Sequence, residues 1–154
     1  MTVEQFMAGN AVIGVLEADH GAASGLRYSL PEAGYVVREV RGSKMRTVDA
    51  LFDEFAAAFQ FPYYFGANKD AFDEVMRDLD EFVGAAPGYV VVVRDADQLL
   101  ADDPDQLSWF ADAMSFYAEN WADRTDPATF RVVLHTADAA FAKHTPSGAV
   151  ALNL

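Results

Sequence analysis

The sequence predicts an α/β protein whose core is a small three-stranded parallel sheet with helices packed on it. Three short segments, residues 35–40, 89–93 and 130–134, are rich in β-branched and aromatic residues, as is typical of strands. The segments between them carry apolar residues at helical spacing. Because these connections are long enough to act as crossovers, the three strands can pair in parallel.

The chain has 154 residues, of which 52% are apolar, and this suits one domain with a sizeable core. We expect that core at about residues 35–135. Residues 1–34 read as an N-terminal elaboration, in which 11–16 and 26–30 could form strands of a hairpin at a sheet edge. Residues 136–154 read as a C-terminal helix and a tail that could hold one more short strand.

The predicted helices follow in chain order. Thr47 can cap a helix that Pro62 ends, and Asn68 can cap a second helix that runs to Val83. The third and longest begins at Asp103-Pro104, where an acidic cap is followed by a proline in the first turn. A short helix over residues 137–143 follows the third strand.

The net charge of −13 would repel the phosphates of a nucleic acid, so the sequence argues against direct nucleic-acid binding. The same charge favours cationic partners. The chain has no cysteine, hence no disulfide and no thiolate metal site. Its N-terminus lacks the basic start and apolar run of a signal peptide, and its longest aliphatic run, Val90 to Val93, is too short to cross a bilayer. We therefore expect a cytoplasmic protein that binds neither membranes nor nucleic acid.

No set of catalytic residues is visible. The sequence has no Gly-x-Ser-x-Gly elbow, no phosphate-binding glycine loop and no His-Glu-x-x-His motif. The acidic cluster at residues 95–105 lacks the spacing, glycine turn and closing glutamate of a calcium loop. We expect a non-catalytic protein without a metal or cofactor.

The most informative stretch is residues 61–76, an aromatic elbow that leads into an amphipathic helix. Gly66 can supply a backbone angle that other residues avoid, and Asn68 is a good N-cap. Helical spacing places Asp70 and Glu74 on the outward face, with Asp73 beside them. The segment therefore predicts a helix that presents acidic side chains outward.

The same stretch resembles the signature of the barstar family, which are small intracellular ribonuclease inhibitors. The resemblance extends over about residues 35–135 and implies the fold described above. This chain departs from the family's usual signature at four positions within the same stretch. The residues that carry the resemblance are Phe61-Pro62, Tyr64, Gly66, Asn68, Asp70-Ala71-Phe72 and Glu74, and the departures are Phe65, Lys69, Asp73 and Glu74.

The resemblance implies a role for each matched residue. Asp70 and Glu74 are expected to enter a nuclease active site in place of RNA phosphates, and Tyr64 to pack on the catalytic histidine. Gly66 and Asn68 are expected to shape the binding segment. Glu119 is a candidate for a further peripheral acid, and Asp112 is an equally good one.

We therefore predict an antitoxin or immunity protein, monomeric when free, whose partner is a basic, secreted or toxin-type ribonuclease. Two alternatives remain open at this point. Arg41, Arg94 and His135 lie at predicted strand ends, where a small-molecule-binding protein or small enzyme would hold its ligand. Trp109 and Phe116 lie off the main stripe of the long helix and either pack against the terminal segments or form the face of a self-associating scaffold.

Overall fold

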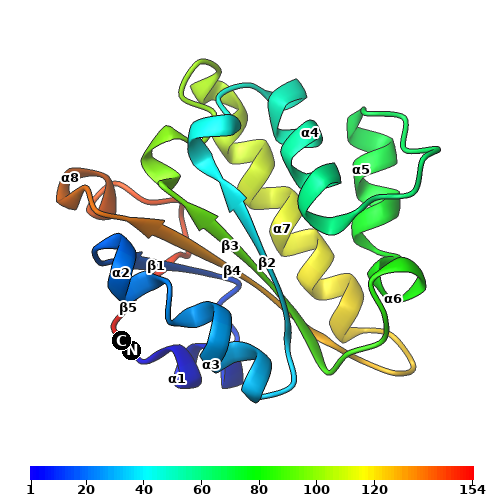
Figure 1. Ribbon diagram of the computed structural model, residues 1–154, viewed down its shortest axis with the longest axis horizontal. Coiled ribbons are helices and arrows are strands. Elements are labelled where there is room, and N and C mark those ends of the chain that lie inside the picture. Colours follow the sequence, from blue (N-terminus) through cyan, green and yellow to red (C-terminus); the bar gives the residue numbers. More distant parts are fainter.

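The computed structural model describes residues 1–154 and contains a parallel sheet of five strands in the order β2-β3-β4-β1-β5 (Figure 1). The three predicted strands correspond to β2, β3 and β4, which are neighbours. The fold class and the parallel pairing are confirmed, but the predicted number of strands was wrong. The strands are β1 (Ile13–Glu17), β2 (Val36–Arg41), β3 (Gly88–Arg94), β4 (Thr129–Thr136) and β5 (Val150–Leu152).

The N-terminal region is part of the sheet and not a hairpin at its edge. Strand β1 pairs in parallel with β4, from Ile13 opposite Val132 to Glu17 opposite Thr136, and β5 then pairs with β1 as the short strand expected in the tail. Residues 26–30, predicted as a strand, belong to helix α3, in which Leu26 and Leu30 are one turn apart and both buried. A short apolar run does not distinguish strand from helix by its spacing, which explains the error.

Helices cover both faces of the sheet (Figure 1). Helices α4, α5 and α7 pack on one face, and α1 and α3 pack on the other. None of the helices is both long and apolar enough to cross a lipid bilayer. The helices are α1 (Val3–Ala8), α2 (His20–Ala23), α3 (Leu26–Glu32), α4 (Val48–Phe59), α5 (Lys69–Met76), α6 (Leu79–Phe82), α7 (Leu107–Ala122) and α8 (Ala139–Ala142).

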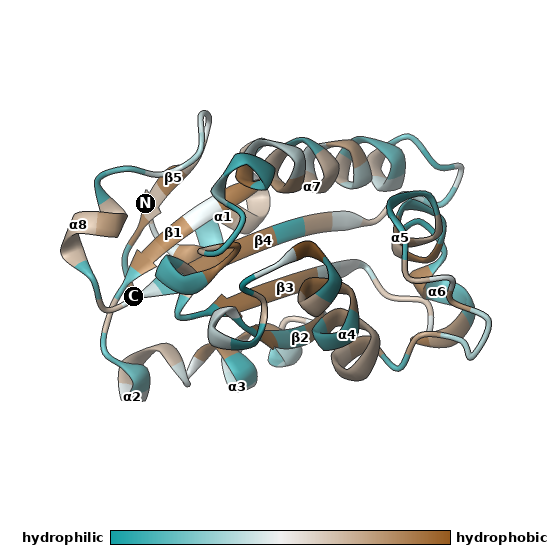
Figure 2. Ribbon diagram, turned by 90° about the horizontal axis from the view of Figure 1, so that it is seen from above, coloured by the Kyte–Doolittle hydropathy of each residue, from teal (hydrophilic) through white to brown (hydrophobic).

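Strand β3 explains why two helical layers are needed. Its side chains alternate between the two faces, so Val91 and Val93 join the core under α4, α5 and α7, while Val90 and Val92 join the core under α1 and α3. All four are buried. Figure 2, coloured by hydropathy, shows this strand as hydrophobic along its length. A strand with both faces apolar is stable only when both are covered.

The helix predicted from Asn68 to Val83 begins as expected but is interrupted at Arg77 and Asp78, between α5 and α6. The amides of Arg77 and Asp78 bond to carbonyls three residues back, on Glu74 and Val75, so the last turn of α5 tightens. The apolar spacing continues across the break because Leu79 still faces the core. The start predicted at Thr47 is confirmed, since its hydroxyl caps α4. At Asp103-Pro104 a short 3-10 turn, Pro104–Gln106, forms first and α7 starts at Leu107, and the side chain of Asp103 makes no capping hydrogen bond.

Candidate protein-binding site

The aromatic side chains of the elbow, residues 60–68, point either into the core or out to solvent. Phe61 and Phe65 turn inward and pack edge to face, with ring centroids 4.9 Å apart. Tyr63 and Tyr64 turn outward, and Tyr64 leaves 66% of its surface exposed. The two neighbouring residues therefore differ, since Phe65 supports the loop from inside and Tyr64 is exposed at the surface.

The backbone of the elbow differs from the prediction at Gly66. The positive φ of this loop falls on Ala67, at 51°, and not on the glycine. A Cβ added to Gly66 would lie 3.3 Å from Nδ2 of Asn68, a close approach that would push on the side chain that caps α5. Gly66 therefore provides space for the cap and not an unusual backbone angle.

Helix α5 holds the two predicted acids on its outward face. Oδ1 of Asn68 accepts a hydrogen bond of 2.8 Å from the amide of Ala71, which confirms the predicted cap. Asp70 follows in the first turn, where a carboxylate interacts favourably with the helix dipole. Glu74 comes one turn later, and both side chains are exposed and have no hydrogen-bond or ion-pair partner within the chain.

Helix α7 contacts α5 near both ends of α5 and holds it in position. At one end, Nζ of Lys69 donates to Oε1 of Gln106 at 2.6 Å and lies 4.6 Å from the ring centroid of Trp109. At the other end, the indole of Trp121 donates to the carbonyl of Met76 at 3.0 Å. The order of these contacts shows that the two helices run side by side in the same direction. The outward acids are therefore carried by a helix whose position is fixed from both ends.

Asp73 differs from the other two acids. It is half-buried, and its Oδ1 accepts a hydrogen bond from the hydroxyl of Tyr117, which is buried within the core. Burial, together with the bond to Asp73, raises the pKa of Tyr117 far above its usual range, so the phenol remains protonated and donates. The sequence places Tyr117 on the buried stripe of α7, where a phenol needs a partner, but it does not identify that partner.

The peripheral acid candidates lie on α7. Glu119 is exposed between Tyr117 and Trp121, which both donate hydrogen bonds to α5, and its side chain has no partner within the chain. Asp112 is also exposed and unpaired, nearer the start of the helix. The structure thus places Tyr64, Asp70 and Glu74 on the elbow and α5, and places Glu119 on the adjacent helix.

The three basic residues at the strand ends each contact an internal partner, although Nε of Arg94 and Nδ1 of His135 remain buried without one. Arg41 forms a bidentate ion pair with Glu54, and Arg94 bonds to the carboxylate of Glu39 and to a backbone carbonyl. His135 is fully buried, and its Nε2 lies 2.9 Å from the carbonyl oxygen of Ala18. Burial lowers the pKa of His135 and favours its neutral form. The cavities described by their lining residues do not include Arg41, Arg94 or His135, and a ligand site at these strand ends stays a prediction.

His20 lies exposed at the surface and contacts the same group of residues. Its Nε2 lies 2.8 Å from Oδ1 of Asp95, and its ring packs edge-on against that of His135 at a centroid distance of 5.3 Å. Nothing in its local sequence signals these contacts, because His20 begins α2, Asp95 follows β3 and His135 belongs to β4, which are far apart in the chain.

The two aromatic residues off the main stripe of α7 behave differently from each other. Trp109 packs against Phe52 of α4 and Phe72 of α5. The predicted packing against the terminal segments was therefore wrong for Trp109. Phe116 keeps 44% of its surface exposed, and the guanidinium of Arg77 lies 5.5 Å from its ring centroid. Trp109 therefore packs under α5, and Phe116 borders α5 at the protein surface.

Comparison with solved structures relates the fold to a larger protein. The structure of the ORC2 protein of Aeropyrum pernix in its ADP form matches with a TM-score of 0.54 and 11% sequence identity. The match covers 88% of this chain and 38% of that chain, so this chain spans well under half the length of its neighbour. At this identity the likeness shows the fold alone. A comparison with curated proteins found no match.

The family comparison is more specific. A family model described as Barstar (barnase inhibitor) matches residues 35–135, the same range over which the sequence resembles that family. This range includes the elbow, α5 and α7, and it excludes β1, β5 and the helices before β2. Because the match covers more than half of the chain, the protein belongs to the barstar family.

Proposed function

We propose that this protein binds a cytotoxic ribonuclease and blocks its active site, with the carboxylates of Asp70 and Glu74 in place of RNA phosphates. The observation that carries the proposal is the pair itself: two exposed, unpaired carboxylates one helical turn apart, on a helix held at both ends. Membership in a family described as barnase inhibitors supports the same function. The exposed Tyr64 supplies an aromatic surface beside the acids.

The geometry suits such an inhibitor for physical reasons. Residues four apart on a helix lie about 6 Å apart along its axis and point to the same side. Since α5 is already fixed against α7, little conformational entropy would be lost when the acids meet a basic pocket. The net charge of −13 would also attract a cationic enzyme and speed the encounter.

The remaining site residues receive supporting roles in this proposal. Gly66 and Asn68 set the start of α5, and Asp73 holds α5 to α7 through Tyr117. Glu119 extends the acidic surface onto α7. Acting inside the cell that makes it, such an inhibitor would serve as an antitoxin or immunity protein against a basic, secreted or toxin-type ribonuclease.

The ORC2 structure is an ADP form, but nucleotide binding is not favoured for this chain. The end of β1 and the turn after it carry Glu17 and Asp19, whose carboxylates would repel phosphate groups. Asp19 already caps α2 by accepting from the amide of Ala22 at 2.7 Å. The acidic character of this turn supports the protein-binding function over a nucleotide-binding one.

The proposal is tested by inhibition assays against a panel of guanyl-specific ribonucleases that includes barnase. Asp70→Asn and Glu74→Gln should each weaken inhibition about 30-fold, because each removes a charged hydrogen bond worth about 2 kcal/mol. Asp49→Asn is a matched control, since Asp49 is an exposed acid in the first turn of α4. Glu32→Gln, at the exposed end of α3 on the other face of the sheet, is the control for Glu74.

Thermal melting of all four variants separates lost contacts from lost stability. Equal potency of wild type, Asp70→Asn and Glu74→Gln would remove the proposed roles of these acids. Failure of the wild-type chain to inhibit any enzyme of the panel would contradict the proposed function itself.

A further inference from the structure

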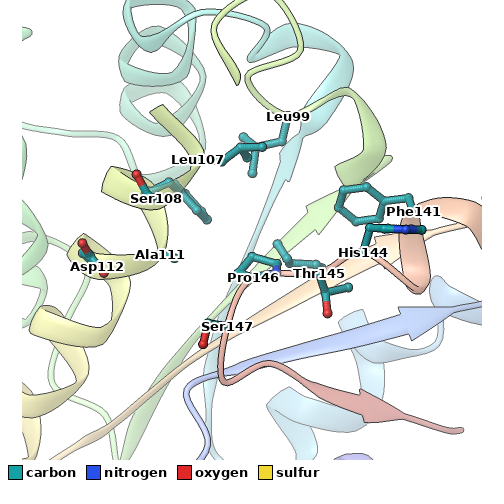
Figure 3. A pocket seen from close by; sticks show the side chains of 12 residues that line it. Leu99, Leu107, Ser108, Ala111, Asp112, Phe141, His144, Thr145, Pro146 and Ser147 are labelled. Carbon is teal, nitrogen blue, oxygen red and sulfur yellow. The ribbon is translucent and has the colours of Figure 1, made fainter. Parts of the chain in front are cut away.

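A cavity of about 320 Å³ lies between α7 and the C-terminal segment 141–147 (Figure 3). Its inner wall is apolar and comes from four different elements or turns, through Leu99, Phe110, Leu134 and Phe141. Of these, Leu99, Phe110 and Leu134 belong to the buried core. The volume falls at the lower end of the range that small-molecule sites occupy, and an apolar interior is typical of such sites.

The rim of the cavity is polar. Figure 3 shows Ser108 and Asp112, from α7, on one side and Thr145 and Ser147, from the C-terminal segment, on the other. Asp112 is the acidic residue that lines the cavity, and no lysine or arginine lines it. The carboxylate has no hydrogen-bond or ion-pair partner within the chain, so it is available to a ligand.

His144 adds a second acceptor to the rim. Its Nδ1 lies 3.0 Å from the carbonyl oxygen of Ala140. Because a carbonyl oxygen only accepts hydrogen bonds, this contact requires the proton on Nδ1, and in that tautomer Nε2 is an acceptor. The rim therefore offers a carboxylate and a ring nitrogen to a group that donates hydrogen bonds and carries positive charge.

We propose that this cavity binds a small amphipathic amine, with an aromatic or short alkyl body against the apolar wall and a protonated amino group beside Asp112. The negative charge of the whole protein favours a cation over an anion at this rim. No residue of α5 or of the elbow lines the cavity, so this site is separate from the outward face of α5. The proposal does not depend on ribonuclease inhibition.

The test uses the full chain and three probes of similar shape: 2-phenylethylamine, 2-phenylethanol and 3-phenylpropanoate. Binding is followed by calorimetry and by amide NMR shifts at pH 8. The amine should bind and shift amides that line the cavity, the alcohol should bind about fivefold more weakly, and the acid should bind weakest. Asp112→Asn should lower the affinity for the amine about fivefold and leave that for the alcohol unchanged.

Two further variants make the result specific to the cavity. Asp123→Asn removes an exposed acid at the end of α7, far along the helix from the cavity, and should leave amine binding unchanged. Ser108→Trp, at an exposed position of the rim, should block both the amine and the alcohol. Equal losses in Asp112→Asn and Asp123→Asn, equal binding of alcohol and amine, or no shifts at the cavity would each overturn the proposal.

Discussion

Glu54 shows how a single residue is held charged inside this protein. It is 9% exposed, and its carboxylate accepts three hydrogen bonds of 2.8 Å from Arg41, one from the backbone amide and two from the guanidinium. The side-chain bonds from Arg41 lower the pKa of Glu54 below its ordinary value. Such a carboxylate stabilises the fold only while it is ionised.

Glu54→Gln is expected to lower the free energy of unfolding at pH 7 by about 2 kcal/mol, the loss expected for bonds to a charged group. A lowered folded-state pKa gives stability that is present above the unfolded value, about 4.5, and is lost as the pH falls through the folded one. Urea denaturation from pH 3 to 7 should therefore show the two proteins converging at acid pH. Asp53→Asn, an exposed acid on the same helix, is the control. Parallel curves for Glu54→Gln and wild type would contradict this account.

At the scale of elements, α5 is the helix that the proposed function needs, and its start and its orientation have different causes. Asn68 caps its first turn by a local hydrogen bond, while Phe72, Val75 and Met76 bury its inner face. Its direction relative to the rest of the molecule comes from α7, through Lys69 at the start and Met76 at the end. The cap acts on the first turn, whereas packing acts on the whole helix.

Asn68→Ala is expected to lower the free energy of unfolding by about 1 kcal/mol, because the amide of Ala71 loses its acceptor. Asn68→Asp should retain most of the stability, since a carboxylate also caps a helix. Chemical denaturation measures the loss, and hydrogen exchange should speed up at Ala71 before it does at Val75. The same stability for the alanine and aspartate variants would show that this cap contributes nothing.

At the scale of the whole molecule, the segments outside the family match are part of the core. Val90, Val92 and Val133 of the central strands are buried under α1 and α3. Strand β1 covers the edge of β4 that a 35–135 fragment would leave unpaired. Exposed strand edges and apolar faces promote association between chains.

A fragment of residues 35–135 is therefore expected to be partly unfolded or aggregated, although it spans the matched family region. Size-exclusion chromatography with light scattering, together with circular dichroism during urea titration, compares the fragment with the full chain. A monomeric fragment that unfolds cooperatively, with a midpoint close to that of the full chain, would show that residues 1–34 and 136–154 are dispensable for folding.

Local chemistry made several parts of this structure predictable. The strands β2, β3 and β4 follow from runs of β-branched residues, and the caps at Thr47 and Asn68 follow from side-chain oxygens placed before an apolar stripe. The exposure of Asp70 and Glu74 follows from helical spacing alone. Each of these features depends on residues that lie close together in the chain.

The amino-acid sequence by itself therefore determined the α/β class, the starts of α4 and α5, and a pair of outward acids in a segment with the barstar signature. Only the tertiary structure decided that β1 lies beside β4, that Asp73 is held by Tyr117, and that segment 141–147 encloses a cavity with α7. The physical reason is the same in each case. Spacing and capping act over one or two helical turns, whereas strand pairing, buried hydrogen bonds and cavities join residues that are distant in sequence and meet only in the folded chain.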